Sequence, residues 1–262
     1  DENNYTWHPD LGYHGLVEFA NRTLTFVLIA LALGVFFAAL RSGADRLTIR
    51  LAVIAGCGIP FQGVIGGITV LTHLNPFVVA LHLVLSLALV VILTKLLMHV
   101  RGVEVHQVPF FALWTSRFAF VAMCLACWLG TVVTGSGPHS GGGGAARTGF
   151  DIATVARIHA ASVWATVILT VVSLIALHRA GSTAAKWAWV LLGVELVQGA
   201  IGYYQYLHGV PMLAVLLHML GAGVAVAAAA GVLFAVRPVT DGRTPADQKI
   251  SGSMAAATKS SA

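Results

Sequence analysis

The sequence predicts an all-α, polytopic membrane protein. Hydrophobic residues make up 58% of the 262 residues, charged residues make up only 10%, and the mean hydropathy is +0.85. A soluble domain of this length would carry more charge than that. The apolar residues also fall in runs of about 20, the length that a helix needs to cross ~30 Å of hydrocarbon. These runs are uniformly apolar, which excludes the alternating pattern of a membrane β-barrel.

Seven such runs occur along the chain, and each is expected to be a helix. A backbone in lipid must satisfy its hydrogen bonds within its own segment, and a helix does so. We place the runs at about 16–40, 51–74, 76–98, 109–134, 152–177, 187–206 and 211–236. The residues after the last run are rich in Ser, Ala, Thr and Gly, so we expect a disordered tail at 238–262.

Lys and Arg are unevenly distributed over the loops. The loops after the first, third and fifth runs, together with the tail, hold Arg41, Arg46, Arg50, Lys95, Arg101, Arg179, Lys186, Arg237, Arg243 and Lys249. The opposite loops are almost free of cations, and the N-terminal segment is acidic. This bias predicts an outer N-terminus and a cytoplasmic C-terminus. It also accounts for the net charge of +5, so the charge gives no indication of nucleic-acid binding.

Two stretches of the chain are internal repeats of each other. Residues 62–82 read QGVIGGITVLTHLNPFVVALH and residues 198–218 read QGAIGYYQYLHGVPMLAVLLH. Both begin Gln-Gly-x-Ile-Gly and end with a His twenty residues after the Gln. When the alignment is extended backwards, Asn21 falls against His159. Each repeat thus has a span with a polar residue near its start, a Gln-Gly span, and a span with a His near its start.

The second repeat has one more span, at 109–134, for which the chain holds no counterpart in the first. The repeat therefore predicts two pseudo-symmetric four-helix bundles, with seven spans in this sequence and an eighth expected before it. The expected units are an N-terminal half-bundle at 1–108 and a C-terminal half-bundle at 109–237, arranged as parallel repeats.

Three histidines lie at matched depth in these spans. His82, His159 and His218 are each six or seven residues inside the outer end of a span, roughly 10 Å below the surface at 1.5 Å per residue. Ionisable groups at such depth are costly and usually face the bundle interior to perform a function. Zinc would need three or four ligands, whereas two imidazoles from facing helices suit a haem iron with two axial ligands. We therefore expect His159 and His218 to bind haem, while His82 faces Asn21 in a pocket with one imidazole.

The stretches VEFANR, QGVIGGITVLTHLNPFVVALH, LGTVVTGSGPH, ARIHA and VPMLAVLLHMLGAG resemble the haem A synthase family of bacteria and mitochondria, over roughly residues 11–236. The resemblance implies haem b in the C-terminal half and a pocket for haem O in the N-terminal half. It also implies an oxidoreductase of the bacterial cell membrane that oxidises a haem O methyl group to the formyl group of haem A. The implied partners are haem O synthase, the assembly pathway of terminal oxidases and an electron donor of unknown identity.

The resemblance also implies roles for single residues. His159 and His218 resemble the haem b ligands, His82 resembles a ligand of the substrate haem, and Glu18 resembles the acidic residue of the family's Glu-x-x-His motif. Asn21 stands where that motif has its His, a variation that resembles an actinobacterial branch of the family. The outer-loop Cys pairs of many members are not in this sequence.

Glu18, Asn21 and Arg22 share one helical face, because they are three or four positions apart. Glu18 is the candidate catalytic residue, since a carboxyl group there can exchange protons or stabilise positive charge at the oxidised carbon. Arg22 is expected to neutralise Glu18 or to hold a haem propionate, and the alternative is a plain ion pair at the helix start. Arg157 is the propionate candidate of the second pocket, with interfacial snorkelling as its alternative.

Four further residues are candidate pocket contacts. Gln62 and Gln198 repeat in frame, although a buried Gln also bridges helices. His73 and His208 lie at the outer ends of two spans, where they cap the pockets or lie in the membrane interface.

Other polar residues fall outside the two pockets. Glu195 lies deep in the sixth span without a repeat partner, and Arg117 is its candidate partner. His99, His106 and His178 lie on the cytoplasmic side, where we expect them to be solvated.

A second class of function is a non-catalytic dihaem cytochrome b that moves electrons within the membrane. Electron transfer alone would favour two haems with both axial positions filled, so Asn21 favours the enzyme. A transporter fits less well, because its sites would lie near the midplane on broken helices.

Overall fold

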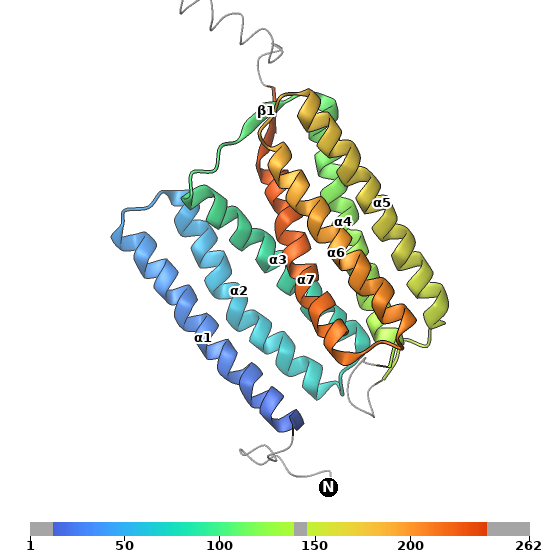
Figure 1. Cartoon of the computed structure of the whole chain (residues 1–262). Coiled ribbons are helices and arrows are strands. Elements are labelled where there is room, and N and C mark those ends of the chain that lie inside the picture. Colours follow the sequence, from blue (N-terminus) through green and yellow to red (C-terminus); the bar gives the residue numbers. More distant parts are fainter. Residues whose placement is uncertain (1–12, 139–145, 240–262) are drawn as a thin grey trace, which may run out of the picture.

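The structure, a computed structural model, describes residues 13–138 and 146–239, without the side chains of 13–18, Asn21 and Arg22. The described residues form seven helices and two short strands (Figure 1). In chain order these are α1 (Tyr13–Arg41), α2 (Arg46–Leu71), α3 (Pro76–Val100), β1 (His106–Val108), α4 (Phe110–Ser136), α5 (Ile152–Arg179), α6 (Ala185–Leu207), α7 (Met212–Phe234) and β2 (Val236–Pro238). The predicted all-α fold is confirmed. The disordered tail expected at 238–262 was wrong at Pro238, which belongs to the paired strand β2, and residues 240–262 lie outside the described part.

Six of the described helices are long and apolar enough to cross a membrane, which confirms a multi-pass membrane protein. They are α1 from Thr23 onward, α2, α3, α4, α5 and α7. The helix α6 is 23 residues long, but it carries Glu195, Gln198 and Gln205 and is not among the six. The helix α6 packs between α5 and α7 (Figure 1). Its residues are less apolar than those of its neighbours, so a seventh span at 187–206 stays a prediction.

Polar loop residues fix where two of the helices begin. The Asp45 carboxylate accepts a hydrogen bond from the Thr48 N–H at 2.7 Å, so α2 begins at Arg46 and not at the expected 51. Asp151 caps α5 in the same way, with the Thr154 N–H at 2.8 Å. The hydroxyl and the N–H of Thr154 hold the pKa of Asp151 below its ordinary value.

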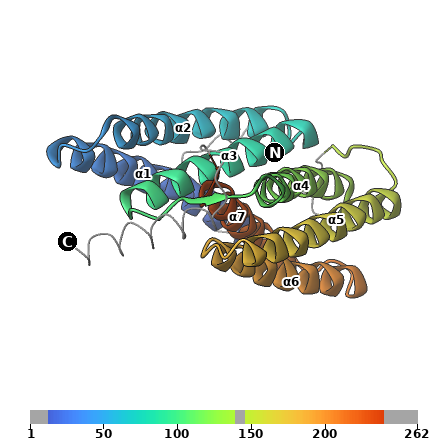
Figure 2. The ribbon, with the colours of Figure 1, turned by 90° about the horizontal axis from the view of Figure 1, so that it is seen from above.

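The helices α4, α5, α6 and α7 close into a four-helix bundle. In this ring α5 packs on α4 and α6, and α7 packs on α6 and α4 (Figure 1). On the outside of the bundle α3 packs against α4 and α7, α2 packs on α3, and α1 packs on α2 (Figure 2). Most large hydrophobic side chains described for α1 are exposed, as at Phe26 and Leu31. The helix α3 contacts both α4 and α7, so the two expected halves are packed against each other. Their division at 1–108 and 109–237 stays a prediction.

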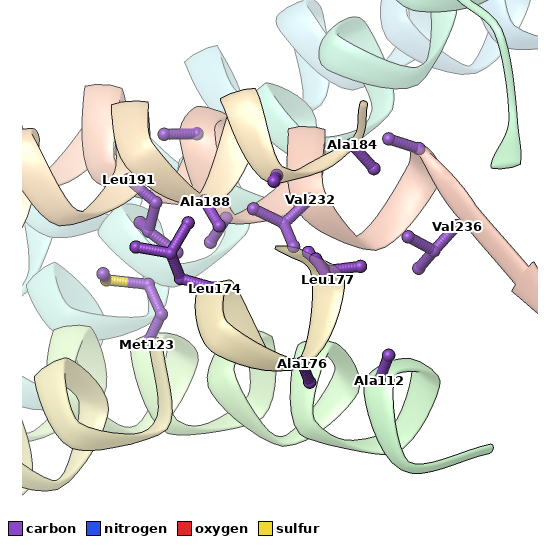
Figure 3. Packing of buried hydrophobic residues seen from close by; sticks show 14 of the residues in the cluster. Ala112, Met123, Leu174, Ala176, Leu177, Ala184, Ala188, Leu191, Val232 and Val236 are labelled. Atoms are coloured by element: carbon purple, nitrogen blue, oxygen red, sulfur yellow. The ribbon is translucent and has the colours of Figure 1, made fainter. Parts of the chain in front are cut away.

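The hydrophobic core lies inside the α4–α7 bundle. Small side chains such as Ala184 and Ala188 alternate there with larger ones such as Leu177, Leu191 and Val232, and all five are at most 1% exposed (Figure 3). Small residues let helix backbones approach closely, which is how helices associate in a membrane. This packing holds α5 and α7, the helices that carry His159 and His218, in a fixed relation.

The cation-rich end of the molecule is tied by contacts between loops. Strand β1 pairs in parallel with β2, and the ring of His106 bonds the Thr183 hydroxyl at 2.7 Å. The ring of His99 pairs with Asp45 at 2.5 Å, and His178 accepts a hydrogen bond from the indole N–H of Trp189 at 3.0 Å. We expected these three histidines to be solvated: His178 is exposed, whereas His99 and His106 are half-buried, and each of the three also has a protein partner.

In the two repeated stretches the helices end and begin at matching positions, and the turns between them share their backbone conformation. Helices α2 and α6 end 136 positions apart, and α3 and α7 begin 136 positions apart, the same offset as between His82 and His218. In the turns between them, Leu74 and Val210 both adopt left-handed backbone, with φ of 58° and 60°. Their N–H groups donate to carbonyl oxygens five positions earlier, at 2.8 Å in both turns.

Candidate functional site

The structure brings His159 and His218 together across the α4–α7 bundle. His159 lies on α5 and His218 on α7, and their ring centroids are 6.5 Å apart with the planes at 90°. Both rings are half-buried. Two imidazole–metal bonds of about 2 Å, together with the distance from each nitrogen to its ring centre, add up to roughly 6 Å. The separation therefore fits one metal ion bound between the two rings.

The ring nitrogens are arranged for this role. The Nδ1 atom of His159 lies 3.1 Å from the carbonyl oxygen of Ala126, and that of His218 is buried without a partner. A neutral imidazole that donates from Nδ1 to a backbone carbonyl keeps Nε2 as a lone-pair donor, which is the common arrangement of metal-bound histidine. Two nitrogen ligands from diagonal helices suit a planar haem, which supplies the remaining ligands of its iron.

A glycine lies against each of these rings. A Cβ at Gly130 of α4 would be 3.3 Å from Cε1 of His159, and a Cβ at Gly202 of α6 would be 3.6 Å from Cε1 of His218. The first distance is tighter than an ordinary carbon–carbon contact, so a larger residue would push the His159 ring. Sequence reasoning noted the repeated glycine of Gln-Gly-x-Ile-Gly but gave no role to it.

The first repeat shows the same contact. A Cβ at Gly66 of α2 would lie 3.5 Å from Cε1 of His82 on α3, and this pair is the counterpart of Gly202 and His218. The Nδ1 atom of His82 and the Oε1 atom of Gln62 are buried without hydrogen-bond partners. Buried polar atoms are rarely left unpaired, so this region suits a ligand with polar groups.

A comparison with protein families finds a match to the part of the chain that contains the first repeat. The family model COX15-CtaA, described as cytochrome oxidase assembly protein, matches residues 11–139. Over these residues, just under half of the chain, the sequence is similar to the cytochrome oxidase assembly family. No curated protein matches the chain. The match spans α1 to α4, so the assembly-family region contains His82 and Gly130, whereas His159 and His218 lie beyond it.

Three predicted residues of the assembly-family region have side chains outside the described residues. They are Glu18, Asn21 and Arg22, whose backbone is helical within α1. Their helix approaches α2 nearby, because a Cβ at Gly63 would lie 3.8 Å from Cγ2 of Thr25, about one turn after Asn21. That Asn21 faces His82 stays a prediction.

The remaining candidates lie around the two pockets. The Gln198 side chain packs directly over Gly221 of α7, which leaves no room there for a Cβ. His73 and His208 are exposed at the ends of α2 and α6, and His208 stacks on Tyr204 with centroids 4.1 Å apart. Arg157 is exposed near the start of α5. Roles for all four in binding stay predictions.

The expected partner of Glu195 was wrong. Glu195 accepts a hydrogen bond from the hydroxyl of Thr170 on α5, at 2.8 Å, while the guanidinium of Arg117 lies over the ring of Trp114. Arg117 is near the cation-rich start of α4, where it covers an aromatic face, and Glu195 is in the middle of α6. Sequence reasoning also missed the hydrogen bond from the Trp164 indole to the Tyr203 hydroxyl, which joins α5 and α6 at 3.3 Å.

Proposed function

We propose that this protein is a haem A synthase, which oxidises a methyl group of haem O to the formyl group of haem A. The observation that carries the proposal is the pair of imidazoles on α5 and α7, with ring centroids 6.5 Å apart. The proposal is also supported by the glycine–histidine contact that recurs in the first repeat, within the region of the assembly family.

In this proposal haem b is the resident cofactor of the α4–α7 bundle, where it supplies one-electron transfer when bound. His159 and His218 would hold its iron, and the Ala126 carbonyl would orient the His159 ring through Nδ1. Gly130 and Gly202 allow both rings to lie against helix backbone. Arg157 is the proposed partner of a propionate.

The first pocket is the proposed substrate site. His82 binds the iron of haem O, and Asn21 leaves the opposite side without a second imidazole, so that the substrate can enter and leave. Glu18 is the proposed catalytic residue: it accepts a proton as hydrogen is removed from the methyl carbon. Arg22 would hold a propionate or neutralise Glu18, and Gln62 and His73 are the proposed further contacts. Gln198 and His208 are their proposed counterparts in the haem b pocket.

The proposed setting is a bacterial cell membrane with both pockets toward the outer face and the C-terminus in the cytoplasm. The reaction consumes the product of haem O synthase and supplies a terminal oxidase. Oxidation of the methyl group removes electrons from it, so the reaction needs an external electron acceptor that exchanges electrons with haem b. Lipid surrounds the exposed apolar faces of the helices.

The experiment is complementation of a bacterial strain that lacks haem A, followed by pigment analysis. Cells with the full-length protein are expected to regain haem A. Glu18→Gln keeps the shape of the side chain but removes proton exchange, so haem A should fall by about 10²–10⁴-fold while haem b content stays normal. Glu104→Gln, which changes an exposed loop carboxylate, is the matched control and should leave haem A unchanged.

A dihaem cytochrome b is the second candidate, and one observation favours it: His82 packs on Gly66 as His218 packs on Gly202. Pigment extraction separates the two candidates. Haem O or haem A beside haem b supports the synthase. Haem b alone in both pockets contradicts it and supports the cytochrome.

A further inference from the structure

A buried carboxyl group without a charged partner lies in the middle of the α4–α7 bundle. Glu195 of α6 is 4% exposed. Its Oε1 atom accepts a hydrogen bond from the Thr170 hydroxyl at 2.8 Å, and its Oε2 atom is buried with no partner. One turn away from Thr170 and from Glu195 on their own helices, Leu174 and Leu191 belong to the buried hydrophobic cluster (Figure 3).

One of the proposed haem ligands, His218, contacts α6 about two helical turns from this carboxyl group. Gly202, which lies against His218, is seven positions after Glu195 on α6. At 1.5 Å per residue this separation is roughly 10 Å along the helix axis. A charge at Glu195 therefore interacts with a charge between the two histidines, because a bundle interior screens little.

A row of hydroxyl groups on α5 runs past Glu195. Ser162, Thr166, Thr170 and Ser173 follow His159 at spacings of three or four, so they share one face of the helix. Thr166, Thr170 and Ser173 are at most 1% exposed. We call these four residues the α5 hydroxyl row.

The α5 hydroxyl row continues to the cation-rich end of the bundle. The Ser173 and Ser116 hydroxyls bond each other at 2.8 Å, and each lies six positions from the end of its helix nearest to β1 and β2. At the other end of the row, the Ser162 hydroxyl donates to the carbonyl oxygen of His159 at 2.6 Å. Hydroxyl groups both donate and accept, so together with water molecules they can carry protons.

No cation neutralises Glu195 among the described residues. The titratable side chains of the surrounding helices are, on α4, Arg117, Cys124 and Cys127, on α5, Arg157, His159, His178 and Arg179, and on α7, His218. Arg157, His178 and Arg179 lie near the ends of α5, far along the helix from Thr170. Arg117 is placed over Trp114 instead. Ionisable groups buried in a membrane bundle are costly and often form proton relays. A positive charge on an oxidised haem would favour the Glu195 carboxylate, and loss of that charge on reduction would favour the neutral acid.

We propose that Glu195 is a redox-linked protonation site, reached by protons from the cation-rich end of the bundle through the α5 hydroxyl row. This inference rests on the proposed haem b site. In this proposal, reduction of the bound haem by one electron from a one-electron reductant such as dithionite would be matched by uptake of one proton at the Glu195 carboxylate, which becomes a neutral acid. Removal of that electron by a one-electron oxidant such as ferricyanide would be matched by loss of the carboxyl proton to the row.

The test is a redox titration of the purified, full-length protein at several pH values, with dithionite as the reductant. For one electron coupled to one proton, the midpoint potential falls by up to about 59 mV for each tenfold decrease in proton activity. Glu195→Gln should give a potential that no longer depends on pH. Glu104→Gln, with its exposed carboxylate altered, should keep the wild-type slope.

Infrared difference spectra supply a second readout. Reduction of the wild-type protein should add a C=O stretch of a protonated carboxyl group, and Glu195→Gln should lack this band. Thr170→Val removes the hydrogen bond to Oε1 but keeps the carboxyl group, so the band should shift and persist.

The outcomes distinguish the two proposals. Equal slopes for the wild-type protein and Glu195→Gln, with intact haem, would overturn the redox link and leave the proposed function standing. A carboxyl band at Glu195 that persists unchanged through oxidation and reduction would also overturn it. A purified protein without any haem b spectrum would contradict the haem site itself.

Discussion

Each of the three histidine rings in the proposed pockets lies against a glycine of a neighbouring helix. The tightest of these contacts is the one between Gly130 and His159, where a Cβ would lie 3.3 Å from the ring. Core packing tolerates little added volume, so even one methyl group forces a neighbour to move. The glycines therefore position the ligands without touching the iron.

Gly130→Ala is expected to displace the His159 ring and to weaken its bond to iron. The absorption spectrum of bound haem b should shift toward a mixture with a high-spin form, and haem occupancy should fall several-fold. Gly193→Ala in α6 is the matched control, because a Cβ there meets nothing within 4 Å. An unchanged spectrum in Gly130→Ala would show that the ring has room to adjust.

Asp45 provides a pH-dependent contribution to stability at the cation-rich end. The N–H of Thr48, together with the ring of His99, lowers the pKa of Asp45 from 3.8 to about 2. Because the folded pKa is the lower one, this contribution is present above pH 3.8 and is lost as the pH falls toward 2.

Asp45→Asn keeps a side-chain oxygen for the cap but removes the charge. The thermal unfolding temperature of the variant in detergent should fall less steeply between pH 4 and 2 than that of the wild-type protein. Equal slopes in the two proteins would contradict the role of the ionised carboxylate.

At the scale of elements, the turns after α2 and α6 share left-handed backbone although their sequences differ. A non-glycine residue pays roughly 1–2 kcal/mol in this conformation, and a β-branched residue such as Val210, with φ of 60°, is the most restricted. The hydrogen bond from the Val210 N–H to the Gln205 carbonyl maintains the turn.

Val210→Gly is expected to raise the free energy of unfolding by about 1 kcal/mol, because glycine adopts this backbone without strain. Val133→Gly, within α4, should lower it by a similar amount, since glycine weakens a helix interior. Chemical unfolding in detergent measures both. A destabilised Val210→Gly would show that the side chain contributes more than the backbone strain costs.

The sequence was sufficient to predict the helices, because a membrane span depends on a long apolar run. The meeting of His159 and His218 was also predictable, since the repeat aligns them with a second set of residues at the same depth. The pairing of β1 with β2 could not be predicted, because three-residue strands have no periodicity. The partner of Glu195 was missed because a hydroxyl of Thr170, and not a cation, lies at its depth.

At the scale of the whole molecule, one bundle is closed and the other set of helices is open. The helices α4–α7 form a ring with a buried core, whereas α1 packs chiefly on α2 and exposes most of its described large side chains. The repeat predicts an eighth span on the open side of α1–α3. The proposed assignment of haem b to the bundle and haem O to α1–α3 therefore rests on the histidine pair of the bundle and on the repeat.

Haem content and the absorption spectrum of the purified, full-length protein test this assignment most directly. We expect His159→Ala and His218→Ala each to lose the low-spin haem b spectrum, because each removes one of two axial ligands. His82→Ala should keep that spectrum, and so should Glu104→Gln, which changes an exposed loop carboxylate. Retention of the spectrum in His159→Ala, or its loss in His82→Ala, would contradict the two-pocket assignment.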